Sequence, residues 1–409
     1  MTPILLLILG IIIRNDAGLS GYYSSLRYPV ADTVTRDTTL PNTELRSYWS
    51  INLDAKQPGY QIQTDNNLQL STASLTDYLN FACTVPLNQV LNFATGVDGE
   101  VCYYHHYLPL LADTTLRNSY LNAKLSAGLQ YRLNDRLTIS ARDNLEHQHY
   151  LPVDSFYYNY YLNRAKLGFD AQLSELSTLT LECGLNRLWT RTQPGQNYTE
   201  SSLYLNWNVY PGTDWNLQFD NSLTRRSYPE KTRSYLELNP ALVISRNFGS
   251  ALELSLNASP RMNLFDETTT VYQNQITSQL GMECQLQPSN GLTLRAGPQT
   301  ELLRSLDRIS SQDYHEISLS LAIELVRSAR FWITAENRYG IRRYLLNDSA
   351  LQSDYRFNEF NLYSTWKITN LPPGELSLEL MLNIAPEWHS EAIDNLAALT
   401  SSLQLRYRW

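Results

Sequence analysis

The sequence lacks the features that mark several common classes of protein. Its 409 residues contain 32 Lys and Arg against 40 Asp and Glu, which gives a formal charge of −8. A nucleic-acid-binding chain would carry a strongly basic face, and this composition does not supply one. The mean hydropathy of −0.34 is that of a water-soluble chain. A wall that is apolar only at alternate positions is hidden by such an average.

Long apolar runs are also scarce, since the only one covers residues 3–13. This run is shorter than the roughly 20 residues that a transmembrane helix needs. Its length fits the apolar region of a secretory signal peptide, with Ala17 as the cleavage position. Residues 1–17 are therefore predicted to be a signal peptide, with a misassigned start or an unusual anchor as the alternatives.

Few residues suggest catalysis or metal binding. The four cysteines form no CxxC pair, and the chain has no GxSxG, HExxH or phosphate-binding loop motif. His147 and His149 lie two residues apart, so they share one face of a strand, but two imidazoles alone are more typical of a surface. We expect no enzyme activity, no cofactor and no metal site.

What the sequence has in abundance is alternation of apolar and polar residues. Leu121, Ala123 and Leu125 alternate with Asn122 and Lys124, and similar stretches recur up to the last residue. A period of two places the apolar side chains on one face of a β-strand. Cys83, Cys183 and Cys284 share the apolar parity of their strands, which predicts that they act there as small hydrophobic residues.

The connections between the predicted strands alternate in length. Short turns are predicted at residues 134–136, 174–177, 211–214, 247–250, 288–291, 328–330 and 370–375, with longer polar segments between them. Short turns at one end and long loops at the other are typical of membrane barrels. The repeat of about 40 residues also suggests a propeller, but a blade needs four short strands where this unit has two long ones. A soluble β-sandwich is the other alternative, although its strands would be shorter.

The final segment carries a recognisable pattern. Leu403, Leu405, Tyr407 and Trp409 alternate with Gln404, Arg406 and Arg408. An amphipathic last strand that ends in an aromatic residue resembles the carboxyl-terminal signal of Gram-negative outer-membrane proteins. The whole repeat resembles the porins and the barrel part of TonB-dependent receptors. The resemblance implies a bacterial outer-membrane location, contact with outer-membrane lipid and recognition by the barrel-assembly machinery.

The predicted fold is all-β, a single transmembrane antiparallel up-and-down β-barrel of about 18 strands, with 16–18 favoured. Residues 46–409 are assigned to the barrel, and residues 18–45 to a periplasmic segment or a small plug in the lumen. Tyr and Trp prefer the membrane interfaces. We therefore expect Trp215, Phe331 and Trp366 near the short turns, and Tyr150, Tyr228 and Tyr344 near the long loops, to lie at those interfaces.

The polar parity should face the lumen. We predict that Lys124, Arg132, Arg142, Arg164, Asp170, Glu182, Glu253, Arg261, Glu283, Arg295, Glu336, Arg338, Glu379 and Arg406 face it, together with Glu146, Glu316 and Arg342. A wet lumen of this kind suggests passive diffusion of small polar solutes through a porin-like channel. Alternatively, these charges only pair across strands, as in a non-conducting surface-interaction barrel or a barrel component of a transport or secretion assembly. A homo-oligomer is possible, since many porins form trimers.

Overall fold

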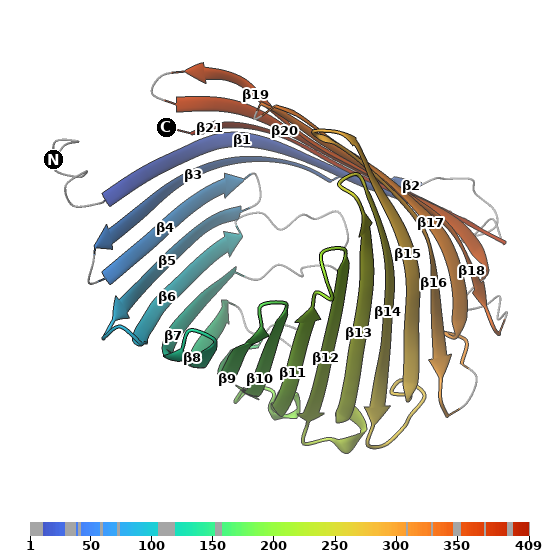
Figure 1. Ribbon diagram of the computed structural model, residues 1–409, viewed down its shortest axis with the longest axis horizontal. Coiled ribbons are helices and arrows are strands. Elements are labelled where there is room, and N and C mark those ends of the chain that lie inside the picture. The colour runs from blue at the N-terminus through green and yellow to red at the C-terminus, as the bar shows by residue number, and fades with distance from the viewer. Residues whose placement is uncertain are drawn as a thin grey trace.

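The computed structural model describes residues 11–28, 38–39, 42–57, 60–71, 74–104, 119–151, 158–307, 310–328, 330–346, 353–371, 374–390 and 396–408. These residues form one sheet of 21 strands that curls into a barrel (Figure 1). The helices of the described part are two three-residue turns, Pro194–Gln196 and Lys231–Arg233. Among the described residues, no helix has the length and apolar character to cross a membrane.

Apart from the two-residue strand β2, each strand pairs antiparallel with the next one along the chain. The strands are β1 (Ile11–Tyr28), β2 (Thr38–Thr39), β3 (Asn42–Gln57), β4 (Tyr60–Ser71), β5 (Ser74–Pro86), β6 (Leu91–Tyr104), β7 (Ser119–Asn134), β8 (Leu137–Leu151), β9 (Tyr160–Ser174), β10 (Ser177–Trp189), β11 (Tyr198–Val209), β12 (Trp215–Ser227), β13 (Tyr235–Phe248), β14 (Leu252–Phe265), β15 (Gln275–Ser289), β16 (Leu292–Ser305), β17 (Tyr314–Ser328), β18 (Phe331–Tyr344), β19 (Tyr355–Leu371), β20 (Gly374–His389) and β21 (Leu396–Arg408). The predicted all-β, up-and-down antiparallel fold is therefore confirmed.

The first and last long strands close the sheet. The backbone of β1 pairs with β21 from Asp16 opposite Arg408 to Arg27 opposite Ala397, and its other edge pairs with β3. Figure 1 shows β1 lying beside both partners. Closure leaves neither β1 nor β21 with an unpaired edge, which is the condition for a sheet to cross a lipid bilayer.

The amino-terminal part of the wall differs from the sequence assignment. Residues 11–28, which were divided between a signal peptide and a segment ending at residue 45, form β1 within the barrel wall. Strand β4 was not recognised because Asn66 and Asn67 interrupt its apolar alternation. Strands β1 and β4 account for most of the difference between the 21 observed strands and the roughly 18 strands expected from the sequence. The signal peptide itself stays a prediction.

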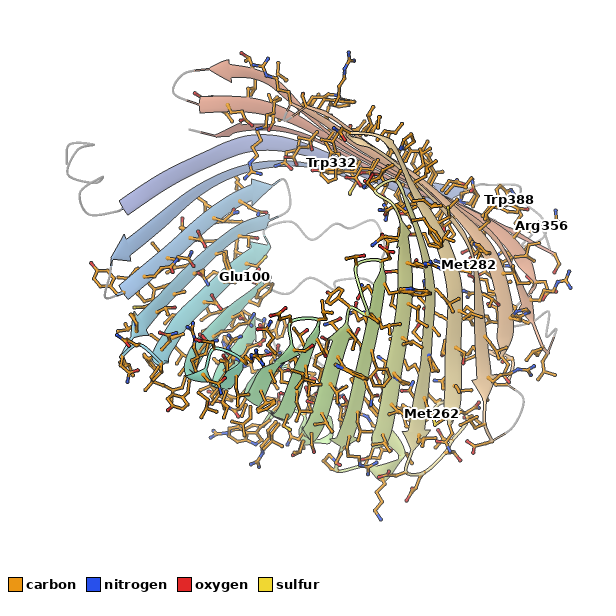
Figure 2. All side chains as sticks on the ribbon, in the orientation of Figure 1. Glu100, Met262, Met282, Trp332, Arg356 and Trp388 are labelled. Carbon is orange, nitrogen blue, oxygen red and sulfur yellow. The ribbon has the colours of Figure 1, made fainter. Side chains whose placement is uncertain are left out.

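Alternation gives the wall two chemically different faces, and Figure 2 draws the side chains that project from them. On β17, Ile317, Leu319, Leu321 and Ile323 share one face, and the Leu321 side chain is 50% exposed. The neighbouring strands continue this apolar face through the register of the sheet. We call it the outer face, and we call the opposite, polar face the inner face.

From β5 onward, the short turns lie together at one end of the barrel and the longer connections at the other end, which we call the mouth. Gly212, Gly249 and Gly291 have positive φ angles of 93°, 70° and 88°, which side chains with a Cβ rarely adopt. Each of these glycines lies in a tight turn between an incoming and an outgoing strand. The end with short turns therefore follows from local turn chemistry.

The assignment of the two faces can be tested on β14. Leu256 belongs to the outer face, whereas its neighbour Ser255 lies on the inner face directly opposite Glu283. In lipid vesicles, Leu256→Arg should lower the free energy of unfolding by roughly 2–4 kcal/mol, because its charge would face hydrocarbon. Ser255→Arg is the matched control and should cost far less. Equal costs in denaturant titrations would overturn the assignment.

Candidate functional site: the inner wall and the mouth

The register of the strands places the predicted lumen-facing residues together on the polar face that we call the inner face, and their contact with a lumen stays a prediction. Lys124 lies opposite Asp98 and Glu146, Glu283 lies opposite Ser255, and Arg406 lies opposite Ser377. Arg132, Arg142, Arg164, Asp170, Glu182, Glu253, Arg261, Arg295, Glu336, Arg338 and Glu379 share that face by the same alternation. Their role in selectivity stays a prediction.

At the mouth, most of the described hairpins close in the same way. The residue just before the second strand of the hairpin is Asn, Asp or Ser. Its side-chain oxygen caps the hairpin by accepting a hydrogen bond from a backbone N–H near the end of the first strand. The bonds are Tyr150 to Asn159, Thr190 to Asn197, Tyr228 to Ser234, Phe265 to Asn274, Ser305 to Asp313 and Tyr344 to Asp354, at 2.7–2.9 Å. Short polar side chains suit such positions because they reach nearby backbone groups.

The residue after this cap is usually a tyrosine on the inner face. The ring of Tyr120 lies 5.9 Å from that of Tyr150, and the ring of Tyr314 lies 5.9 Å from that of Tyr344. Tyr198 with Tyr228, Tyr235 with Phe265, and Tyr355 with His389 form equivalent pairs. Paired aromatic rings at these distances contribute about 0.5–1.5 kcal/mol beyond their burial. They therefore line the inside of the mouth with aromatic surface.

This arrangement corrects the placement of three tyrosines. Tyr150, Tyr228 and Tyr344 are expected from the sequence at the membrane interface near the long loops, on the outside of the barrel. Their rings instead contact residues of the inner face. Nearness to a long loop does not decide the face, because one residue of register exchanges inside for outside. The signal in the sequence was the repeated dipeptide of Ser, Asn or Asp followed by Tyr, which ends at Tyr120, Tyr160, Tyr198, Tyr235, Tyr314 and Tyr355.

Just below the tyrosines, three glutamates are buried in the inner wall against arginines. Glu146, Glu200 and Glu316 are 6%, 8% and 1% exposed, respectively. Arg164 lies 2.9 Å from Glu146, and Arg226 donates to Glu200 from Nε at 2.6 Å. The Arg226 guanidinium also stacks 4.5 Å from the Tyr198 ring. A buried carboxylate is tolerated only with such partners, so each pair joins neighbouring strands firmly.

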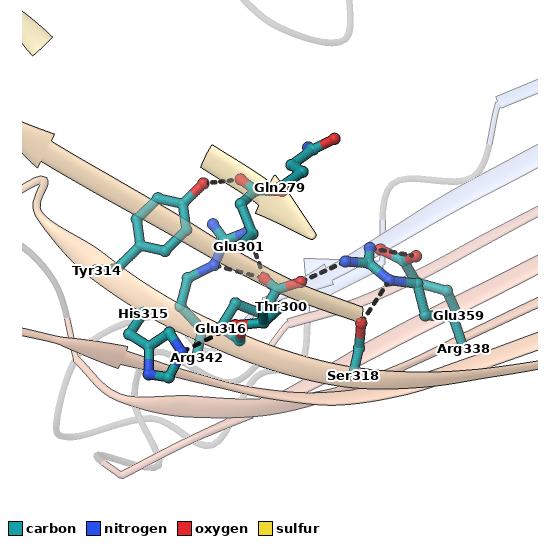
Figure 3. A network of polar contacts seen from close by, with 10 residues as sticks. All are labelled: Gln279, Thr300, Glu301, Tyr314, His315, Glu316, Ser318, Arg338, Arg342 and Glu359. Atoms are coloured by element: carbon teal, nitrogen blue, oxygen red, sulfur yellow. Dashed lines mark hydrogen bonds and ion pairs between the residues drawn. The ribbon is translucent and has the colours of Figure 1, made fainter. Parts of the chain in front are cut away.

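The third cluster is the most extensive and is drawn in Figure 3. Glu316 accepts hydrogen bonds from both Arg338 and Arg342, with the Arg342 Nη2 atom 2.6 Å from its carboxylate. Arg338 also contacts Glu359 at 3.3 Å. Arg342 stacks 4.0 Å from the Tyr314 ring. The cluster therefore connects strands β17, β18 and β19 through their side chains.

Tyr314 extends this network to two more strands. Its hydroxyl donates to Glu301 on β16, and Gln279 on β15 donates to the same carboxylate at 2.7 Å. Glu301 lies directly opposite Glu316 in the register, although both are carboxylates. The hydroxyl and amide donors satisfy Glu301, while the arginines neutralise Glu316. The two acids can therefore sit side by side in the wall.

A hollow of about 550 Å³ lies in the inner wall between β5 and β10. Small residues line it at mid-strand, including Ala94, Gly96, Gly128 and Gly168. A Cβ atom at Gly168 would come within 2.5 Å of the Ser140 hydroxyl, so a side chain at this position would require the Ser140 side chain to move. The charged residues of the hollow are Asp98, Arg142, Lys166, Asp170 and Glu182.

The remaining sequence candidates form no site of their own. His147 stacks on the Tyr161 ring at 4.3 Å, and no group of three metal-ligating residues occurs within the described ranges. His105 and His106 lie outside the described residues. At the rim, Asp266 accepts two hydrogen bonds from Arg225, both 2.5 Å long. These bonds hold the pKa of the Asp266 carboxyl below its ordinary value.

Comparisons with known proteins identify the fold. No protein-family model matches the chain, and no curated protein matches its sequence. The alcaligin outer-membrane receptor FauA from Bordetella pertussis matches with 11% identity and a TM-score of 0.57, over 96% of this chain and 76% of that one. The siderophore receptor PirA from Pseudomonas aeruginosa matches with 9% identity and a TM-score of 0.56, over 95% and 80%.

A third solved structure extends the likeness. The FrpB iron transporter from Neisseria meningitidis matches with 8% identity and a TM-score of 0.54, over 96% of this chain and 81% of that one. At such low identity the likeness shows the fold alone. The chain therefore has the β-barrel fold of outer-membrane proteins, which confirms the architectural resemblance found in its sequence.

The importance of the Figure 3 cluster can be measured by removing its central charge. Glu316→Gln should lower the free energy of unfolding by about 3 kcal/mol, because Arg342 would keep its place in the wall without a carboxylate partner. Glu359→Gln is the control and should cost less than about 1 kcal/mol, since the Glu359 side chain is 42% exposed. A Glu316 variant as stable as the Glu359 variant would refute this role.

The caps at the mouth can be tested at Asp313, whose side chain is 1% exposed. It accepts hydrogen bonds from the Ser305 backbone and hydroxyl at 2.8 and 2.7 Å. Asp313→Ala should cost about 1–3 kcal/mol and speed hydrogen exchange of the Ser305 amide. Gln312→Ala removes an exposed neighbour and should leave that exchange rate unchanged. Unchanged exchange in both variants would count against the cap.

Proposed function

We propose that this chain is a barrel of the bacterial outer membrane through which small polar solutes diffuse passively. The observation that carries the proposal is the hydrophilic inner face, which continues from the short-turn end to the mouth. Near the short turns Lys367 contacts Glu375 at 3.0 Å, and near the mouth Arg342 contacts Glu316. A wall that is apolar outside and charged inside suits lipid on one side and water on the other.

The outer face supports the membrane location. Leu403 and Leu405 of β21 are exposed there, and Trp215, Phe331 and Trp366 share the outer parity near the short turns. Tyr407 continues the pattern, while Trp409 lies outside the described residues. The proposal includes recognition of this last strand by the barrel-assembly machinery, in line with the resemblance of its sequence. It assigns the chain no enzyme activity, and the homo-oligomer stays a prediction.

The inner charges divide into two groups, and this division favours a conduit over a merely rigid wall. Glu146, Glu200 and Glu316 are buried in ion pairs that serve the wall itself. Arg142 and Glu336 are exposed on the inner face instead. Exposed charges of both signs contribute little to wall stability, but they face any solute that enters the lumen.

The direct test is the conductance of the purified, folded barrel in a planar lipid bilayer. Stepwise ohmic openings in potassium chloride are the expected result. A correctly inserted barrel that stays silent would refute passive diffusion. It would favour the alternative of a non-conducting barrel or a component of a transport or secretion assembly.

Selectivity gives a second, residue-specific test. Glu336→Lys changes an exposed inner-face charge by two units and should shift the reversal potential toward anion selectivity. The shift should be clear at 0.1 M salt, where the Debye length is about 10 Å, and should shrink at 1 M, where it is about 3 Å. Glu175→Lys makes the same change in a short turn and should leave the reversal potential unaltered. Identical potentials for both variants would show that Glu336 does not face the conducting path.

A further inference from the structure

The hollow between β5 and β10 contains an arrangement of charge that wall stability does not explain. Arg142 on β8 lies directly opposite Lys166 on β9, on the same inner face. Arg164 follows one position further along this face of β9. Like charges placed directly opposite each other destabilise a sheet. Arg142 and Lys166 therefore meet where the pairing of the strands alone would disfavour them, and Arg164 adds a third cation beside them.

The nearby carboxylates compensate only two of these cations. Glu182 lies 2.5 Å from Lys166, and Glu146 lies 2.9 Å from Arg164. The cross-strand partners of Arg142 are Gly128 and Lys166, and its same-face neighbours along β8 are Ser140 and Asn144. None of these four positions carries a carboxylate. Arg142 is exposed, and its neighbours on the inner face do not compensate its charge.

The other two acids of the hollow keep their charge but lie at other register positions than Arg142, and Asp98 is directly opposite Lys124. Asp98 accepts hydrogen bonds from Asn80 and Tyr78. Asp170 accepts one from Thr180 at 2.7 Å and lies opposite Thr138, four residues along β9 from Lys166. The surroundings of Arg142 instead present neutral hydrogen-bonding groups, including Ser126, Gln130, Ser140 and Asn144.

The space in front of Arg142 is open because its neighbours are small. Gly128 lies directly across the strand pair, and Gly168 and Ala94 line the same hollow. A planar guanidinium with free donors in such a space can bind two oxygens of a carboxylate or phosphate at once. The adjacent ammonium of Lys166 adds to the attraction for an anion.

We propose that this hollow is a binding subsite for the acidic group of a small oxyanion solute, a carboxylate or a phosphate. Arg142 is the primary contact, Lys166 assists it electrostatically, and Ser140 and Asn144, which line the same hollow, supply a hydroxyl and an amide as further donors. This inference rests on the proposed function, since it names the class of solute that the conduit would favour. Glu146 and Glu182 act by holding Arg164 and Lys166 in place.

Equilibrium binding tests the subsite independently of conduction. Calorimetric titration of the folded barrel in detergent micelles, at constant ionic strength, should detect inorganic phosphate, succinate or both. Arg142→Gln should weaken that binding about tenfold or more, because a charge-assisted bidentate contact is lost. Arg142→Lys should give a smaller loss, since it keeps the charge but not the planar fork. Binding of phosphate alone or of succinate alone would identify which oxyanion the subsite takes.

The control variant is Lys367→Gln, which removes one positive charge from the inner face of β19 and leaves the hollow intact. Its affinity should match that of the unaltered barrel. If the Arg142 and Lys367 variants lose affinity equally, the loss is caused by net charge alone and the proposal is overturned. The proposal is also overturned if the unaltered barrel binds neither phosphate nor succinate. A barrel that binds phosphate but conducts no ions would support the subsite and contradict the proposed channel. A barrel that conducts but binds neither anion would support the channel and contradict the subsite.

Discussion

The backbone pairing of β1 with β21 is the interaction on which the rest of the structure depends. Without it, the free edges of β1 and β21 would both present unpaired N–H and C=O groups over the length of a strand, which hydrocarbon does not tolerate. Closure satisfies those groups within the wall. It also turns the two faces of a sheet into an outside and an inside, which only then can meet different solvents.

Once the barrel is closed, the alternation of side chains decides which residues meet lipid and which line the interior. The same period of two that exposes Leu319 and Leu321 on the outer face places Ser318 and Ser320 on the inner face. The stability of the wall then depends on contact with lipid outside and on hydrogen-bond partners for the polar groups inside. The inner wall meets this demand with hydrogen-bonded acids such as Glu316, and the mouth meets it with capped hairpin ends such as Asp313.

The inner charges consequently serve two purposes that are separated in space. Near the mouth, acids are buried against arginines and tyrosines, and the resulting clusters join up to five strands into one rigid section. Around the hollow, glycines and serines keep side-chain volume low, and Arg142 stands opposite Lys166 with no carboxylate at its neighbouring positions on this face. Rigidity and a polar, open surface can coexist because they occupy different parts of the wall.

The sequence alone was enough to determine the class of fold, the alternation of short turns and long loops, and the parity of residues such as Arg142 and Glu336. These properties depend on neighbours along the chain, so a local pattern reveals them. Residues 11–28, strand β4 and the inward position of Tyr150 were decided only by the tertiary structure. So were the pairing of Glu316 with Arg342 and the meeting of Arg142 with Lys166. Each of them depends on which residues lie opposite one another across strands, and that register is set by closure of the whole sheet.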